Sequence, residues 1–251
     1  MRLHVGTDSL RGDIAAYAKR FDMLELLTEK GRLPRVARLA EMRRAVSDGF
    51  LFSLRLPKSL VGLEWNAEAE AGLAYVMDVA DVLGAEILVL QTPPSVMPSA
   101  RTRRRLVELA ARLPKQRTLA WEPRGLWQEE DSEAVALEMG AVLVRDVSRE
   151  PAPPGATLYT RLRALGRSGV SLDAIARTAE AVVSSALACV VIEGDGAARA
   201  ASSLRQLVGE ALEEAALEDE DEPGDADEEL GDDEDEELGD DEDEDDDEDD
   251  V

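Results

Sequence analysis

The sequence predicts an α/β protein of the (β/α)8 barrel class, followed by an acidic C-terminal segment. Short aliphatic runs alternate eight times with longer stretches of helical period, as in a parallel sheet with helical crossovers. No glycine-rich nucleotide-binding turn follows the first predicted strand, and the acidic residues gather at one end of the chain. The eightfold alternation and the missing glycine-rich turn favour a closed barrel over its rival, an open doubly wound sheet.

The predicted strands are short and almost continuously apolar, which is typical of parallel strands buried on both faces. In chain order they are Leu3–Val5, Met23–Leu26, Leu51–Leu54, Ile87–Leu90, Thr118–Trp121, Val142–Arg145, Leu158–Leu162 and Cys189–Ile192.

The predicted helices are amphipathic stretches between and after these strands. They are Ile14–Arg20, Pro34–Ser47, Ala67–Leu83, Arg101–Leu113, Ser132–Met139, Ser171–Leu187 and Ala197–Leu217. Ser171 is expected to cap the helix that follows it, and Asp131 or Ser132 is expected to cap the helix that contains Met139.

Charge divides the chain into a body, residues 1–217, and a tail, residues 218–251. Residues 218–250 hold 26 of the 55 acidic residues and none of the 28 Lys and Arg, so the body carries 29 acids against 28 bases. The tail repeats the octapeptide EELGDDED at residues 228–235 and 236–243. Because it has few apolar residues to offset charge repulsion and ordering entropy, we predict that it is disordered.

Several classes of function are excluded or disfavoured by composition. No run of 18 apolar residues and no hydrophobic leader is present, so we expect a cytoplasmic protein without membrane spans. One Cys and one His leave no zinc motif, and no haem or nucleotide motif is present. The Arg101–Arg105 cluster lacks interleaved aromatic residues, which argues against nucleic-acid binding.

Polar residues follow nearly every predicted strand, where a barrel carries its functional loops. They are Asp8, Glu25, Arg55, Gln91, Glu122 with Arg124, Asp146, Arg161 with Arg163, and Glu193. Such a ring of carboxylates and guanidinium groups suits an anionic or polyhydroxylated ligand. Alternatively, these residues pair with one another at the barrel rim without any ligand.

The stretch from Leu119 to Trp127 places Glu122 and Arg124 in one loop, between two tryptophans. Pro123 cannot donate a sheet hydrogen bond, which favours a turn there. We interpret this loop as part of a functional site, with a tryptophan-lined structural corner as the alternative.

Five segments resemble motifs of the DUF72 (YecE-like) family of barrels, whose activity is undefined. They are Phe21–Pro34, Phe50–Pro57, Leu88–Ser95, Glu122–Trp127 and Tyr159–Ala164. The resemblance covers most of residues 1–208 and implies a (β/α)8 fold. The family's two histidines, its asparagines and its early Asn-x-Thr-Phe-Tyr run are replaced here, which suggests a divergent member that could be non-catalytic.

Two hypotheses follow for function. In the first, the barrel binds or acts on a small anionic or sugar-like molecule, with catalytic candidates Glu122, Asp146 and Glu25 and ligand-binding candidates Gln91, Arg124, Trp127 and Arg161. The carboxylates could also bind Mg²⁺, although no metal site is assigned. In the second, the barrel is a scaffold whose tail binds basic proteins or divalent cations.

Overall fold

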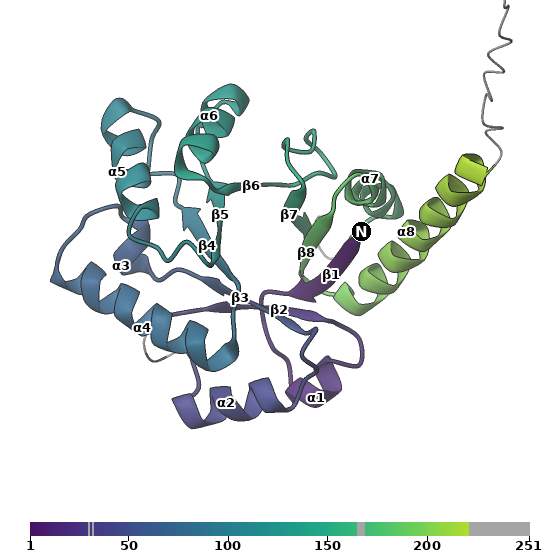
Figure 1. Ribbon diagram of the computed structural model, residues 1–251, viewed down its shortest axis with the longest axis horizontal. Coiled ribbons are helices and arrows are strands. Elements are labelled where there is room, and N and C mark those ends of the chain that lie inside the picture. Colours follow the sequence, from purple (N-terminus) through teal and green to yellow (C-terminus); the bar gives the residue numbers. More distant parts are fainter. Residues whose placement is uncertain (30, 32, 165–168, 221–251) are drawn as a thin grey trace, which may run out of the picture.

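The predicted apolar runs form eight parallel strands that close into a barrel in the order β1 to β8 (Figure 1). The computed structural model describes residues 1–29, 31, 33–164 and 169–220. The strands are β1 (Arg2–Thr7), β2 (Met23–Leu27), β3 (Leu51–Arg55), β4 (Ile87–Thr92), β5 (Thr118–Pro123), β6 (Val142–Arg145), β7 (Thr157–Arg163) and β8 (Leu187–Glu193). The (β/α)8 prediction is confirmed, and the open sheet is excluded because β8 pairs with β1.

Helices surround the ring of strands (Figure 1). They are α1 (Ile14–Tyr17), α2 (Val36–Arg44), α3 (Lys58–Val61), α4 (Ala67–Leu83), α5 (Ala100–Ala110), α6 (Glu129–Met139), α7 (Leu172–Val183) and α8 (Ala197–Glu220). Two helices, α3 and α4, follow β3, whereas the fully described connection from β6 to β7 contains no helix. The eight units are therefore not uniform.

The ends of two helices test the predicted caps. Ser171 caps α7 by accepting a hydrogen bond from the Ala174 backbone N–H at 3.2 Å, as expected. The prediction for α6 is wrong, because the helix begins at Glu129 after Gln128, and the Ser132 hydroxyl donates to the Glu129 carbonyl at 2.8 Å. Helix α8 continues to Glu220, so the predicted tail begins as helix, and residues 221–251 lie outside the described residues.

Buried apolar side chains form two separate clusters, one inside the strand ring and one between the ring and the helices. The inner group includes Met23, Val89, Tyr159 and Cys189. Gly6 also faces this space, and a Cβ there would lie 2.0 Å from the Met23 carbonyl oxygen. The close approach of β1 and β2 therefore requires glycine at this position.

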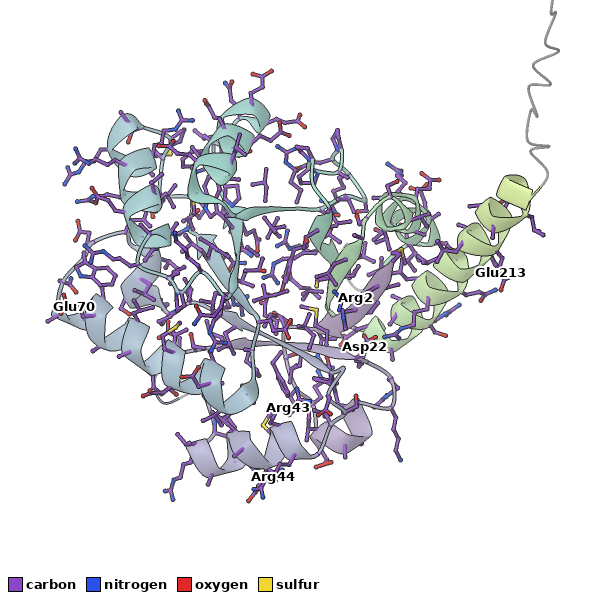
Figure 2. All side chains as sticks on the ribbon, viewed as in Figure 1. Arg2, Asp22, Arg43, Arg44, Glu70 and Glu213 are labelled. Carbon is purple, nitrogen blue, oxygen red and sulfur yellow. The ribbon has the colours of Figure 1, made fainter. Side chains whose placement is uncertain are left out.

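Helix α8 is fixed to the barrel through Asp22, which is labelled in Figure 2 near the start of that helix. Its carboxylate accepts from the Val5 backbone N–H at 2.7 Å and from Arg205 of α8 at 2.9 Å. No helix in the described ranges is long and apolar enough to cross a membrane.

Candidate functional site

The polar strand-end side chains converge at the carboxyl end of the barrel, which we call the mouth. Strand register places Gln91 of β4 opposite Glu122 of β5, and Arg163 of β7 opposite Glu193 of β8. Glu25 of β2 is fully buried at the same end. Because side chains alternate between the two faces of a strand, the residues two positions earlier, Tyr159 and Ser53 among them, lie deeper in the same interior.

Arg161 is the centre of the charge network. Its side chain is 1% exposed and donates to Glu25 at 2.6 Å, to Glu193 at 3.1 Å and to Glu122. Burial alone would lower the pKa of this guanidinium, but the Glu25 and Glu122 carboxylates raise the pKa well above its ordinary value. Arg161 is therefore a permanent buried cation held by three carboxylates.

Glu122 accepts four side-chain donors and is almost completely buried. Besides Arg161, these donors are Gln91 at 2.7 Å, Arg163 at 2.6 Å and Arg124 at 3.2 Å. Burial favours the neutral acid, but the three guanidinium groups and the Gln91 hydrogen bond lower the pKa of Glu122 to about 2. At neutral pH this carboxylate balances positive charge and holds no proton to donate.

The loop after β5 brings Arg124 and Trp127 to the mouth. Gly125 within it has a φ of +102°, and a Cβ there would lie 3.0 Å from the Pro94 backbone. Glycine thus permits the left-handed turn and the close approach to the β4–α5 loop. Trp127 packs edge-on against Trp121, with 5.0 Å between ring centroids, and its indole N–H donates to the Val96 carbonyl at 3.0 Å.

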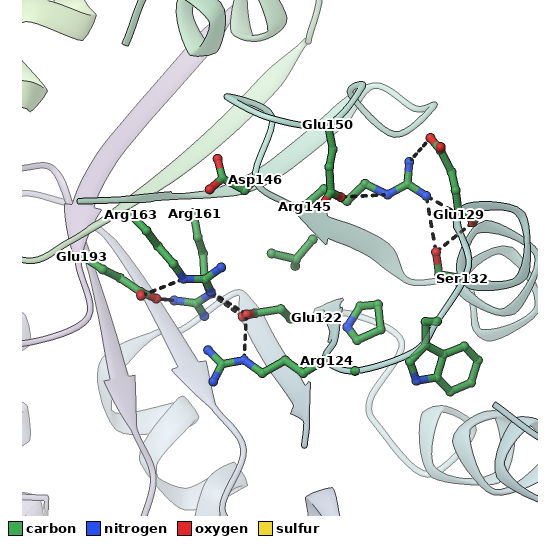
Figure 3. Close-up of a pocket in the computed structure, with 14 residues that line it drawn as sticks. Glu122, Arg124, Glu129, Ser132, Arg145, Asp146, Glu150, Arg161, Arg163 and Glu193 are labelled. Carbon is green, nitrogen blue, oxygen red and sulfur yellow. Dashed lines mark hydrogen bonds and ion pairs between the residues drawn. The ribbon is translucent and has the colours of Figure 1, made fainter. Parts of the chain in front are cut away.

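A cleft of about 700 Å³ opens beside this network (Figure 3). Its wall includes Glu122, Arg124, Asp146, Arg163 and Glu193. Arg124 and Arg163 are 42% and 36% exposed, whereas Arg161, which also lines the cleft, is only 1% exposed. The accessible guanidinium groups of Arg124 and Arg163 are suited to hold an anion.

Asp146 lies apart from this network in Figure 3. Its carboxylate accepts from the Ser148 hydroxyl at 2.5 Å and from the Ser148 backbone N–H at 3.2 Å. It also approaches Arg149 at 3.5 Å. Asp146 therefore lines the cleft but is bonded within its own loop, a geometry that the sequence pattern does not specify.

Asp8, Glu25 and Arg55 form a second part of the mouth, which we call the open sector. Arg55 lies 3.7 Å from Glu25 Oε1 and 3.9 Å from Asp8, within ion-pair range but beyond hydrogen-bond distance. Burial, and then the Glu193 and Glu25 charges, raise the pKa of Asp8, with Arg55 and Arg161 opposing the rise. Asp8 is thus biased towards its protonated form relative to an ordinary aspartate.

The remaining group we call the paired sector, and it comprises Gln91, Glu122, Arg124, Arg161, Arg163 and Glu193. Glu25 lies on the boundary between the sectors. Its Oε2 accepts from Arg161 and from the Tyr159 hydroxyl at 2.7 Å, whereas its Oε1 belongs to the open sector.

Sequence reasoning selected Glu25, Gln91, Glu122, Arg124 and Arg161, and the structure brings all five together. It overlooked Tyr159 and Ser53, whose hydroxyl oxygens lie 3.0 Å apart beneath Glu25. Tyr159 stands two positions before Arg161 on β7, and Ser53 two positions before Arg55 on β3, so each shares a strand face with that arginine. This spacing is the sequence signal that could have identified them. Arg163, Glu193, Asp8 and Arg55 were recognised at strand ends but were not selected.

The carboxylates of the mouth lie next to guanidinium groups and do not cluster with one another. Within the described part of the chain, no three His, Cys, Asp or Glu side chains are grouped so that they could hold a metal ion. The Mg²⁺ prediction therefore has no candidate site among these residues.

Comparison with known proteins identifies the family. The model of the family described as "Protein of unknown function DUF72" matches residues 5–226. A DUF72 family structure from Enterococcus faecalis V583 is 16% identical, covers 82% of this chain and 95% of its own, and has a TM-score of 0.67. One from Thermotoga maritima MSB8 is 18% identical, covers 85% and 100%, and has a TM-score of 0.65.

Two sugar epimerase structures share the fold at lower similarity. An L-ribulose 3-epimerase is 14% identical over 88% of this chain and 97% of its own, with a TM-score of 0.55. A D-psicose 3-epimerase, solved in the presence of D-fructose, is 14% identical over 85% and 98%, with a TM-score of 0.54. Among curated proteins, none matches this sequence.

Proposed function

The chain belongs to the DUF72 family, and we propose that the mouth of its barrel binds a small anionic or sugar-like molecule. The observation that carries the proposal is the pair of accessible guanidinium groups, Arg124 and Arg163, on the wall of the 700 Å³ cleft. A cleft of this volume lies in the range of small-molecule sites, and the carboxyl end of a barrel is where such sites occur.

The paired sector supports this proposal by fixing both arginines. Arg163 donates to Glu122 and Glu193, and Arg124 donates to Glu122 through Nε at 3.2 Å. That bond engages only the Nε of Arg124, so its terminal nitrogens are the ones suited to a carboxylate or phosphate. Preorganised arginines lose less side-chain entropy when an anion binds.

Thermal stability of the full chain with added ligands tests the proposal. The probes are gluconate, fructose 6-phosphate, inorganic phosphate and D-fructose, the last chosen because the two epimerases share this fold. A probe at about 100 times its Kd adds about 2.7 kcal/mol to the free energy of unfolding, which shifts Tm measurably.

Arg124→Gln should abolish this shift, and Arg104→Gln serves as the matched control. Arg104 is 72% exposed on α5 and, among the residues that the structure describes, pairs only with Glu108 at 3.5 Å, so its replacement should leave the shift unchanged. If no probe stabilises the folded wild type, or if Arg124→Gln responds as fully as the wild type, the cleft is not an anion site.

A further inference from the structure

We infer that the open sector of Asp8, Glu25 and Arg55 is a subsite for hydroxyl groups, so that the ligand is an anion that also carries hydroxyls. This inference rests on the proposed function, in which the anionic group of the ligand binds Arg124 and Arg163. It adds that hydroxyl groups elsewhere on the same ligand bind the open sector. The subsite lies where β1, β2 and β3 end, next to the paired sector.

The first observation is the unsatisfied oxygen of Glu25. The side chain is 0% exposed, and no protein group in the described residues donates a hydrogen bond to Oε1. Leaving such a group unsatisfied costs about 1–3 kcal/mol, and more for a charged one. A cost of this size in a buried carboxylate is explained if a bound ligand supplies the donor.

The second observation is that the guanidinium of Arg55 is not hydrogen-bonded to its neighbouring carboxylates. Its side chain is 17% exposed and lies between two carboxylates at 3.7 and 3.9 Å, so both separations exceed hydrogen-bond range. Within the described ranges, the side-chain N–H groups of Arg55 donate to no protein acceptor. Functional hydrogen bonds are often long in a ligand-free site and shorten when the ligand binds.

The chemistry of these three groups selects hydroxyls over other ligands. Asp8 and Glu25 accept hydrogen bonds and Arg55 donates them, whereas a hydroxyl group can do both. A second anionic group would meet two carboxylates and one guanidinium, which is unfavourable. A neutral polyol segment matches the three groups without adding a buried charge.

The two ends of the ligand would be recognised by connected residues. Arg161 joins Glu25 to Glu122, and Glu122 accepts from both Arg124 and Arg163. This chain of charge-assisted hydrogen bonds fixes the hydroxyl subsite relative to the anion subsite.

Three carboxylates of equal chain length test the inference by calorimetry on the full chain. Gluconate carries hydroxyls, hexanoate carries none, and 6-aminohexanoate carries an ammonium group at the far end. We expect gluconate to bind at least about tenfold more tightly than either of the others, because hydrogen bonds to charged groups are lost without the hydroxyls.

Asp8→Asn and Arg55→Gln should reduce the preference for gluconate over hexanoate to near one, and leave the affinity for hexanoate unchanged. Both side chains are partly exposed, so these variants should fold, which a cooperative thermal transition verifies. Arg104→Gln should keep the full preference.

The alternative outcomes separate this inference from the proposed function. Equal affinity for gluconate and hexanoate, lost in Arg124→Gln, would retain the anion site and overturn the hydroxyl subsite. Tighter binding of 6-aminohexanoate would overturn it in favour of an ammonium subsite. If no carboxylate binds to the folded wild type, this inference fails, whereas the proposed function fails only if phosphate, fructose 6-phosphate and D-fructose also leave the thermal stability unchanged.

Discussion

The paired and open sectors of the mouth contain the same kinds of side chain but differ in how these are bonded. In the paired sector both carboxylates are hydrogen-bonded to arginine, and Arg161 contacts both of them as well as Glu25 at the boundary. In the open sector Arg55 stays 3.7 Å and 3.9 Å from its carboxylates. The buried charges Arg161 and Glu122 are saturated by one another and their neighbours, whereas the Arg55 guanidinium is not, so charge alone does not identify a binding residue.

The largest expected effect is the loss of Arg161 from the paired sector. Arg161→Gln leaves Glu25 and Glu122 buried without their shared cation, and breaking a buried pair in this way typically costs about 3–5 kcal/mol. Urea denaturation measures the free energy of unfolding.

Arg145→Gln is the matched control for this experiment. Arg145 is also buried, with 6% of its side chain exposed, but its partners Glu129, Glu133 and Glu150 are 54%, 35% and 59% exposed and remain hydrated without it. A loss as large as that of Arg161→Gln would show that burial of the arginine, and not of its carboxylates, determines the cost.

Acidification should weaken the paired sector next. The pKa of Glu122 is about 2 in the folded protein against an ordinary value of 4.5, so its contribution is complete above pH 4.5 and is lost as the pH falls towards 2. The shift corresponds to about 3 kcal/mol. Chemical denaturation between pH 5 and 2 should show this loss, and Glu122→Gln should flatten the slope. An unchanged slope in the variant would contradict the assignment.

Tyr159→Phe tests the boundary between the sectors. Burial, and then the Glu25 charge, raise the pKa of Tyr159 well above its ordinary value, so its hydroxyl remains a donor to Glu25 at 2.7 Å. Removing this donor should cost about 1–3 kcal/mol in urea denaturation. Tyr75→Phe, on a partly buried tyrosine of α4, is the control and should change stability by less than 1 kcal/mol, on the order expected for such substitutions.

Asp8→Asn should have a small effect of the opposite sign. Because the pKa of Asp8 is raised in the folded protein, its ionisation opposes folding, and this cost appears as the pH rises through and above 3.8. The variant should therefore be more stable than wild type at pH 7, by less than about 1 kcal/mol, and not at pH 3. Lower stability at pH 7 would mean that Asp8 is bonded as tightly as the paired carboxylates.

The fold was predictable from local pattern, whereas the bonding of the site was not. Near-continuous apolar strands and intervening amphipathic stretches identify a parallel barrel, and β4 and β5 lie where the sequence placed them. Their position at the ends of predicted strands also identified Glu25, Glu122 and Arg161 as site candidates. Which arginine binds which carboxylate depends on register between β7 and its neighbours, and on side-chain reach, so the saturation of Arg161 could not be predicted.

Asp146 illustrates the same limit. As a strand-end carboxylate it has the same sequence pattern as Glu122, yet it is bonded to Ser148 two residues later. A short local hydrogen bond of this type competes with contacts across the barrel, and only the loop conformation decides between them.

Measuring unfolding and ligand stabilisation together in Arg55→Gln tests the central claim most directly. The claim is that the open sector serves a ligand and contributes little to the fold. We expect the variant to lose much less stability than Arg161→Gln without ligand, because Glu25 keeps its hydrogen bonds from Arg161 and Tyr159. It should also lose most of the stabilisation that gluconate gives the wild type. If Arg55→Gln is destabilised as strongly as Arg161→Gln, or keeps the full response to gluconate, the distinction between the two sectors is wrong.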